Sequence, residues 1–216
     1  TLDKAILFVD ENKLNDEIKT SFGEEVVEIK NYFEIYEFVK TINKEEIVLI
    51  DSNKISYSIL KNIPAGVKVV NGMNPSTKFK AQKNSVEIEN TKKAHIRDGV
   101  AVTKFMYWLK NNIGKIEITE LSAADKITEL RREQGKFIEE SFGTIAGYAS
   151  NGAIIHYSVT KESNTTLKDR GLFLLDSGGQ YFDGTTDITR TFALGELTKE
   201  EKYHFTTVAR AMIRLS

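Results

Sequence analysis

The stretch LFLLDSGGQYFDGTTDITRTF, residues 172–192, decides how the second half of this 216-residue chain folds. It opens with four apolar residues, which predict a buried strand over residues 172–175. Turn-forming residues follow and predict a reversal of the chain at residues 181–184. Residues 185–192 are rich in β-branched side chains and predict the returning strand of an antiparallel hairpin.

Two carboxylates lie in this predicted hairpin, Asp176 directly after the apolar run and Asp187 further along the returning strand. A turn centred on Tyr181 and Phe182 pairs the two aspartates directly, and one centred on Phe182 and Asp183 makes them diagonal neighbours. Both registers keep the two side chains on one face of the sheet, because successive residues of a strand alternate between faces. The sequence therefore predicts two carboxylates close together on one face.

Carboxylates this close repel unless a proton or a cation neutralises them. A pair of divalent metal ions roughly 3.5–4 Å apart fits between such side chains. We expect the hydroxyls of Thr185, Thr186 and Thr189 to donate hydrogen bonds to Asp187. The alternative is a solvated hairpin tip with ordinary surface aspartates.

Composition excludes several classes of protein. Lys plus Arg number 30 and Asp plus Glu number 31, so the charge balance favours neither a nucleic-acid partner nor a membrane surface. The chain has no cysteine, which excludes disulfides and thiolate metal sites. No apolar run approaches the roughly 20 residues of a membrane span, and no signal-peptide pattern is present. These features predict a cytoplasmic protein.

The first part of the chain alternates short apolar runs with segments of helical periodicity. This alternation predicts an α/β domain over residues 1–72, built from βαβ units around a largely parallel sheet. Asp10 and Asp51 each end an apolar run, and we expect them to cap the following helices, with a ligand crevice as the alternative. The predicted strands are 5–9, 26–29, 46–50 and 67–70, and the predicted helices are 10–22, 32–42 and 53–60.

A polar stretch with Gly and Pro predicts a linker over residues 73–84 and a second domain over residues 85–216. Asn84 and Glu87 form a capping-box pattern at the start of a long helix that runs to about Asn112. The apolar stripe expected to bury this helix consists of Ile88, Ile96, Val100, Phe105, Trp108 and Leu109. Further helices are predicted over residues 120–134 and from residue 199 onward, the first capped by Thr119 and the second by Thr198.

The apolar run at residues 153–157 predicts a buried strand that places His156 at its end. From the residues alone, a structural histidine is the favoured interpretation of His156. His95 and His204 lack any neighbouring ligand pattern, and we expect neither to bind a metal.

Several of these segments together resemble a known family. The runs DSGGQYFDGTTDITRTF, NGAIIHYSVTKESN, AHIRDGVAVTKFMYWL and ITELSAADKITELRR are similar to those of Xaa-Pro aminopeptidases (aminopeptidase P). These belong to the pita-bread metallopeptidases, together with methionine aminopeptidases, prolidases and creatinase. The resemblance extends from about Val86 to the end of the chain. It implies a creatinase N-terminal-like α/β domain, a mixed sheet with flanking helices, followed by the first half of an α+β pita-bread domain.

The resemblance also implies an activity and roles for three residues. The activity is metal-dependent hydrolysis of the N-terminal Xaa-Pro bond of peptides that carry proline at the second position, with two divalent ions, typically Mn²⁺. By family correspondence Asp176 chelates one ion and Asp187 bridges both. His156 contacts the substrate and supports catalysis without binding metal. Nucleic acid and membranes are not expected partners, and a homodimer is left open.

The family's metal site needs five protein ligands, two Asp, one His and two Glu. The His and both Glu would follow Ser216, so we expect this chain to be a piece of a larger enzyme and to be inactive alone. An unpaired apolar face on the last helix then predicts self-association. Alternative functions are a prolidase, a non-catalytic pita-bread scaffold that binds proteins, and a creatinase-like enzyme without metal.

Overall fold

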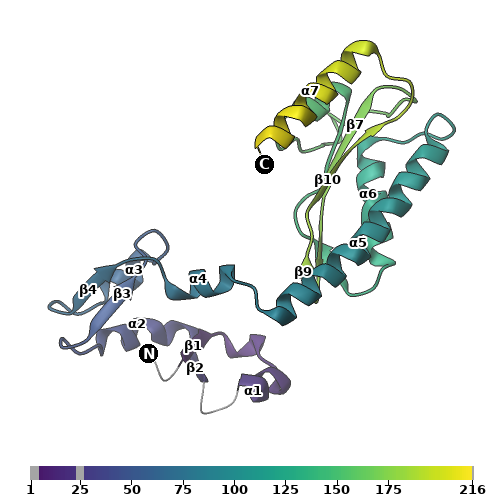
Figure 1. The fold of residues 1–216 in the computed structure, drawn as a ribbon. Helices are drawn as coiled ribbons and strands as arrows, with labels where there is room; N and C mark the ends of the chain where they lie inside the picture. Colours follow the sequence, from purple (N-terminus) through teal and green to yellow (C-terminus); the bar gives the residue numbers. More distant parts are fainter. Residues whose placement is uncertain (1–4, 23–26, 216) are drawn as a thin grey trace. The chain divides into compact units, whose positions relative to one another are not determined.

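The computed structural model describes residues 5–22 and 27–215. The chain divides into two compact units, residues 1–82 and residues 83–216. Figure 1 shows the elements of each unit.

The first unit alternates strands and helices as predicted, but its strands form two separate sheets. In the described residues β1 pairs only with β2 and β3 only with β4, both in parallel, so the single central sheet predicted from the sequence is wrong. Each strand has only four or five residues, and the buried hydrophobic residues in the described part of this unit are Val39 and Val67. The elements are β1 (Ala5–Val9), η1 (Glu11–Lys13), α1 (Asp16–Phe22), β2 (Val27–Asn31), η2 (Tyr32–Glu34), α2 (Ile35–Lys40), β3 (Ile47–Ile50), α3 (Tyr57–Lys61), β4 (Lys68–Asn71) and α4 (Pro75–Ala81).

The aspartates that end two strands of this unit cap the turns that follow. A carboxylate oxygen of Asp10 accepts a hydrogen bond from the amide of Asn12, and Asp51 does the same for the amide of Asn53 (both 3.1 Å). The predicted capping role is confirmed for Asp10, which caps the 3-10 helix η1, but not for Asp51, which caps a turn while helix α3 begins after Ser56. The predicted linker contains helix α4, because Asn74 caps its first turn and proline occupies its first position. The exact domain limits stay predictions.

In residues 83–215 the second unit combines three α-helices with two three-stranded sheets. Its elements are α5 (Ser85–Asn112), α6 (Glu120–Arg132), β5 (Phe137–Glu140), β6 (Ile145–Tyr148), η3 (Ala149–Ala153), β7 (Leu172–Ser177), β8 (Gly179–Tyr181), β9 (Gly184–Thr185), β10 (Ile188–Ala193) and α7 (Lys199–Leu215). The predicted caps of its helices are confirmed: Asn84 with Glu87 for α5, Thr119 for α6, and Thr198 with Glu201 for α7.

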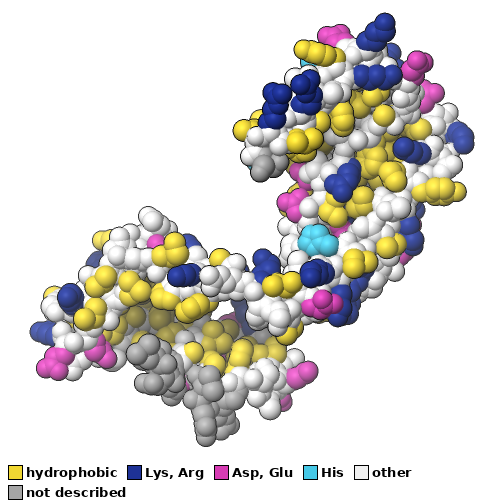
Figure 2. Space-filling model, in the orientation of Figure 1, with side chains coloured by type: hydrophobic (Ala, Val, Ile, Leu, Met, Phe, Trp, Pro, Cys, Tyr) yellow, Lys and Arg dark blue, Asp and Glu magenta, His cyan; other side chains and the backbone are white. Residues whose placement is uncertain are grey.

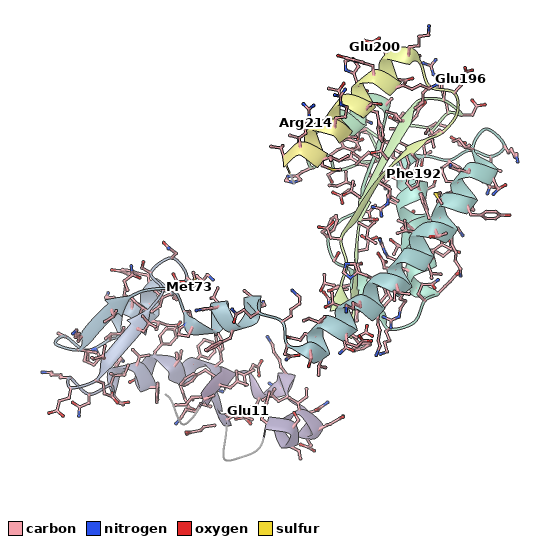
Figure 3. The ribbon with its side chains drawn as sticks, in the orientation of Figure 1. Glu11, Met73, Phe192, Glu196, Glu200 and Arg214 are labelled. Atoms are coloured by element: carbon pink, nitrogen blue, oxygen red, sulfur yellow. The ribbon has the colours of Figure 1, made fainter. Side chains whose placement is uncertain are left out.

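The core of this unit lies between helices α5 and α6 and one face of the sheet β10–β7–β6. Phe173 of β7 and Phe192 of β10 face each other in the ladder, and the ring of Phe192, labelled in Figure 3, lies 5.9 Å from that of Phe105. The two helices contribute small and large apolar residues to this layer: Ala101, Phe105, Leu109, Ala123, Ile127 and Leu130. The helices therefore cover one face of the sheet.

The buried face of α5 differs from the predicted stripe. Its buried residues are Ala94, Asp98, Ala101, Phe105 and Leu109. The predicted Ile88, Ile96 and Val100 are exposed by 44%, 70% and 44%. The stripe was wrong in this half of the helix because a charged residue, Asp98, lies at the centre of the buried face.

Helix α7 has no buried residue in its described part. Its exposed apolar side chains include Phe205, Val208 and Met212, and Figure 2 shows hydrophobic side chains on the visible face of this unit. None of the described helices combines the length and the apolar character that crossing a membrane requires.

Candidate functional site

The long hairpin of the second unit turns at Phe182 and Asp183, which is one of the two registers that the sequence allowed. Asp176 of β7 is opposite Thr189 of β10, and Tyr181 of β8 is opposite Gly184 of β9. The chain therefore turns at residues 182–183, and one register runs through the whole hairpin although its two ends belong to different sheets. In this register Asp176 and Asp187 are diagonal neighbours.

The returning strand is interrupted beside Asp187, where the prediction had one continuous strand. The amide of Thr186 donates to the carbonyl of Gly179, while its hydroxyl accepts from the Gly179 amide (both 2.9 Å). The hydroxyl of Ser141, which follows β5, donates to the Thr186 carbonyl at 2.8 Å. A Cβ atom at Gly178 would lie 2.0 Å from this same carbonyl oxygen, so the break requires a glycine there.

The two aspartates face away from the helices. Phe173 and Leu175 of β7 point into the core, so Asp176 points to the opposite, open face by strand alternation. Asp187 lies one residue before β10 and two residues before Thr189, so the alternation of side chains along this strand assigns it to the same face. Asp176 is half-buried and Asp187 is exposed.

Hydroxyl groups near the aspartates are arranged differently from the prediction. Thr189 donates a 2.7 Å hydrogen bond to Asp176 rather than to Asp187. Thr185 donates to the side chain of Gln180, and Thr186 is occupied by backbone groups. The threonines predicted to serve Asp187 therefore brace the hairpin and orient Asp176.

The segment of His156 is a loop, and the buried strand predicted there is wrong. It consists of η3 followed by a turn in which His156 has a positive φ of 54° and an exposed side chain. Ile154 and Ile155 are exposed by 55% and 86%. The apolar run does not form a strand because the residues around it are bound to a carboxylate of helix α6.

That carboxylate belongs to Glu120, at the first position of α6 and fully buried. It accepts hydrogen bonds from the amide of Tyr148 at 2.7 Å and from the amide of Thr165 at 3.0 Å. The side-chain amide of Asn151 and the hydroxyl of Tyr157 also donate to it, at 3.1 Å and 3.2 Å. Glu120 thus ties both ends of the His156 loop to the helix.

The loop lies against the same sheet face as the aspartates. A Cβ atom on Gly147 of β6 would meet Gly152 of η3 at 2.8 Å, and one on Gly152 would lie 3.7 Å from the Cβ atom of Leu174. Leu174 and Asp176 share one face of β7, the face opposite the core. The structure therefore brings the start of the His156 loop to the open face that carries Asp176.

The turn of the hairpin is bound to helix α5. Arg97 donates two hydrogen bonds to Asp183, at 2.8 Å and 3.0 Å, and Lys136 lies 3.1 Å from the same carboxylate. Hydrogen bonding to Arg97, together with Lys136, lowers the pKa of Asp183 from its ordinary 3.8 to about 2. The next helix residue, Asp98, accepts from the hydroxyl of Tyr181 at 2.7 Å.

Asp98 also forms a fully buried ion pair with Arg131 of α6, with 2.7 Å between Oδ1 and Nε. Burial and the neighbouring Asp98 raise the pKa of Tyr181 well above its ordinary value. The sequence patterns did not reveal the roles of Arg97, Asp98, Glu120 and Arg131. The one available signal was an adjacent Arg–Asp pair on a helix, which is also common on solvated surfaces.

The donor set of the open face fits part of a divalent-metal site. Asp176 and Asp187 offer hard oxygen ligands, which suit ions such as Mn²⁺ or Mg²⁺. In residues 5–22 and 27–215 no group of three or more His, Asp or Glu side chains is placed to hold an ion. His95 contacts the carbonyl of Thr91 and His204 lies 3.6 Å from Glu200, so both are occupied at the surface.

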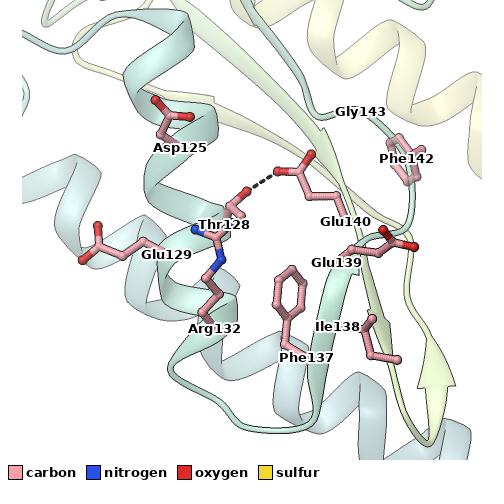
Figure 4. A pocket seen from close by; sticks show the side chains of 10 residues that line it. All are labelled: Asp125, Thr128, Glu129, Arg132, Phe137, Ile138, Glu139, Glu140, Phe142 and Gly143. Carbon is pink, nitrogen blue, oxygen red and sulfur yellow. Dashed lines mark hydrogen bonds between the residues drawn. The ribbon is translucent and has the colours of Figure 1, made fainter.

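A pocket of about 800 Å³ lies elsewhere, between α6 and β5 (Figure 4). Its lining includes Glu129, Arg132 and Glu139, and Figure 4 shows Glu140 hydrogen-bonded to Thr128. None of the predicted site residues lines it. The pocket is separate from the face that carries the aspartates and gives no support for a second active site.

Comparisons with known proteins identify the family of each part of the chain. The model of metallopeptidase family M24 matches residues 89–216, and that of the creatinase/prolidase N-terminal domain matches residues 1–87. A probable Xaa-Pro aminopeptidase P of Sordaria macrospora is 37% identical over 227 residues, covering 100% of this chain and 37% of that protein. One from Aspergillus flavus is 38% identical over 219 residues, covering 97% of this chain and 33% of that protein.

Among solved structures, the X-prolyl aminopeptidase from Caenorhabditis elegans, a cytosolic enzyme with a di-nuclear active site, superposes with a TM-score of 0.82 at 30% identity. That match covers 90% of this chain and 33% of the C. elegans chain. Prolidase from Pyrococcus furiosus, at 24% identity and a TM-score of 0.70, shares the fold. These matches confirm the fold class predicted from the sequence, although the chain spans only about a third of the aminopeptidase relatives. The chain belongs to metallopeptidase family M24, with a creatinase/prolidase N-terminal domain ahead of the M24 part.

Proposed function

We propose that the protein containing this chain removes the N-terminal residue from peptides whose second residue is proline. The observation that carries this proposal is the hairpin register, which puts Asp176 and Asp187 on the open face of the sheet. The names of the relatives, which are Xaa-Pro aminopeptidases, supply the bond that is cleaved.

The two aspartates would hold two divalent metal ions, and we propose Mn²⁺ because the donors are carboxylate oxygens. Such ions supply a water nucleophile near neutral pH and polarise the scissile carbonyl. Thr189 keeps one oxygen of Asp176 in a fixed direction through its 2.7 Å hydrogen bond. Two carboxylates do not complete a dinuclear site, so we propose that the other ligands come from outside these 216 residues.

His156 has the role of a substrate contact in this proposal. Its imidazole is exposed on a loop that begins on the aspartate face, so it is accessible to a bound peptide. A histidine there can hydrogen-bond the substrate near the reacting carbonyl. We propose a cytoplasmic location by analogy with the C. elegans enzyme.

The test uses the full-length protein with Mn²⁺ and a peptide that begins Xaa-Pro. Asp176→Asn and Asp187→Asn should each abolish turnover and weaken Mn²⁺ binding measured by calorimetry. Asp125→Asn, at an exposed aspartate of α6, is the matched control and should leave both unchanged. His156→Ala should lower turnover while Mn²⁺ binding stays intact.

The substrates separate the alternatives. Cleavage of Xaa-Pro dipeptides but not of longer peptides would identify a prolidase. Unchanged Mn²⁺ binding in both aspartate variants would overturn the metal assignment. On the 216-residue chain itself we expect weak Mn²⁺ binding and no turnover, because it offers two carboxylates.

A further inference from the structure

Two consecutive residues of α5 bind the two sides of the hairpin turn. We propose that Arg97 and Asp98 are positioning residues that hold the hairpin in the register that keeps Asp176 and Asp187 on one face. Arg97 binds Asp183 on one side of the turn, and Asp98 binds Tyr181 on the other. We call the two contacts Arg97–Asp183 and Asp98–Tyr181 the clamp. The clamp is independent of the proposed function, whereas the idea that it serves metal binding rests on that function.

The Arg97–Asp183 contact has a defined geometry. Nη1 of Arg97 donates to Oδ1 of Asp183 at 2.8 Å and Nη2 donates to Oδ2 at 3.0 Å, and the Asp183 side chain is only 8% exposed. A bidentate pair of this kind fixes direction as well as distance. The guanidinium also lies over the ring of Tyr181, 5.4 Å from its centroid. Arg97 therefore contacts Asp183 within the turn and Tyr181 at the end of β8.

The second contact is completely buried. The side chains of Asp98 and Arg131 have no exposed surface, and Tyr181 is 1% exposed. The Tyr181 hydroxyl and Arg131 share the carboxylate of Asp98, so the hydroxyl cannot leave without removing a hydrogen bond from a buried charge. A Cβ atom on Gly184 would lie 3.0 Å from that of Ala94, so helix and hairpin are in close contact.

Few hydrogen bonds between the strands of the hairpin fix its register near the tip. Strand β9 has two residues, and the ladder is interrupted between Thr185 and Ile188. A slip of one residue would move Asp187 to the other face of the sheet. The same slip would present Phe182 or Gly184 to Arg97 in place of Asp183, and neither side chain accepts a hydrogen bond. The clamp thus recognises a single register.

The first test measures the stability of the tip directly in the full-length protein. Arg97→Gln, Asp183→Asn and the double variant are compared by hydrogen exchange at the amides of Phe182 and Thr186, which bind Lys136 and Gly179. We expect exchange at these amides to rise about tenfold, with little change at the Leu175 amide in the core strand β7. The double variant should cost less than the sum of the two single variants, because the Arg97–Asp183 ion pair is lost in all three.

The matched control is Lys104→Gln, which breaks the 3.0 Å ion pair of the same helix with Glu133. It should leave tip exchange unchanged. Lys136→Gln removes the exposed partner of Asp183 and should raise exchange at the tip by a smaller factor. It replaces Arg97→Gln in the test if Arg97→Gln does not fold. Equal acceleration at the tip and at Leu175 would show a general loss of stability and overturn the clamp.

The second test asks whether the clamp positions the aspartates. Mn²⁺ affinity, measured by electron paramagnetic resonance, should fall about tenfold in Asp183→Asn, equivalent to about 1.4 kcal/mol, and stay unchanged in Lys104→Gln. A loosened tip with unchanged Mn²⁺ affinity would overturn the positioning role. Absence of Mn²⁺ binding in the unmodified protein would instead overturn the proposed function, and the exchange data would still decide the clamp.

Discussion

Asp98 and Glu120 are both completely buried carboxylates, yet they are stabilised in opposite ways. Asp98 is paired with a charge, the guanidinium of Arg131, and holds the hairpin that carries the aspartates. Glu120 receives hydrogen bonds from backbone amides, an amide side chain and a hydroxyl, and holds the His156 loop. Each segment of the candidate site is thus tied to the helix layer by one buried acid.

Because of this difference, the stability of the hairpin and that of the His156 loop should depend on charge to different extents. A buried ion pair leaves an uncompensated charge when one partner is removed. An acid among neutral donors at a helix N-terminus is stabilised by the helix dipole, and its removal also removes its own desolvation cost. The hairpin should therefore respond to charge changes more strongly than the loop.

The largest effect is expected for Asp98→Asn. This change leaves Arg131 buried without a counter-charge, and one of its nitrogens, Nη1, already has no hydrogen-bond partner. Unfolding free energy, measured with urea, should fall by about 3–5 kcal/mol. Asp125→Asn, at an exposed aspartate of α6, should change it by less than about 0.5 kcal/mol. A small effect of Asp98→Asn would show that the buried ion pair does not make the hairpin sensitive to charge.

A smaller loss, about 2–3 kcal/mol, is expected for Glu120→Ala in the same measurement. Four donors lose their acceptor, but the charge that had to be desolvated is also gone. Hydrogen exchange should accelerate in the loop around His156 more than at the hairpin tip. Glu117→Gln, an exposed neighbour, is the control. If Glu120→Ala costs more than Asp98→Asn, the distinction between the two acids fails.

Tyr181→Phe should cost about 1.5 kcal/mol, because it removes one hydrogen bond to a charged group and leaves the ion pair of Asp98 intact. The ring packing against Phe137 is preserved in this variant. Urea unfolding with an unchanged slope would show that only stability has altered. A loss as large as that of Asp98→Asn would mean that the hydroxyl, rather than Arg131, is the principal partner.

The last effect is expected on acidification. The pKa of Asp183 is lowered to about 2, so its contribution to stability is fully present above the ordinary value of 3.8 and is lost as the pH falls toward 2. In Asp183→Asn this part of the pH dependence should disappear. Unfolding free energies measured between pH 5 and pH 2 in both proteins provide the check. Parallel curves would show that Asp183 is not held by its cationic partners.

Local patterns predicted a good part of the molecule correctly. The capping residues Asn84, Thr119 and Thr198 were identified because a cap depends on residues within one turn of itself. The register of the hairpin was narrowed to two choices because strand parity depends only on chain spacing. The roles of Asp176 and Asp187 as ligands and of His156 as a substrate contact stay predictions.

Errors arose where distant residues decided the outcome. The stripe on α5 was misplaced because counting apolar residues cannot reveal that Asp98 is neutralised by Arg131 from another helix. The run at residues 153–157 looked like a strand, but the hydrogen bonds of its surroundings go to Glu120 on α6. In both cases the segment is held by a buried charged residue. A prediction from local hydrophobicity assumes that such a residue is exposed.

The sequence by itself determined that Asp176 and Asp187 share a face, because a two-residue side-chain period makes that a matter of arithmetic. Only the tertiary structure decided which face that is, since the helices that cover the other one come from residues far away in the chain. It also decided which of the two registers forms, through Arg97 and Asp98, more than 80 residues before the turn that they bind. Packing and buried hydrogen bonds join such distant partners, and no local pattern records them.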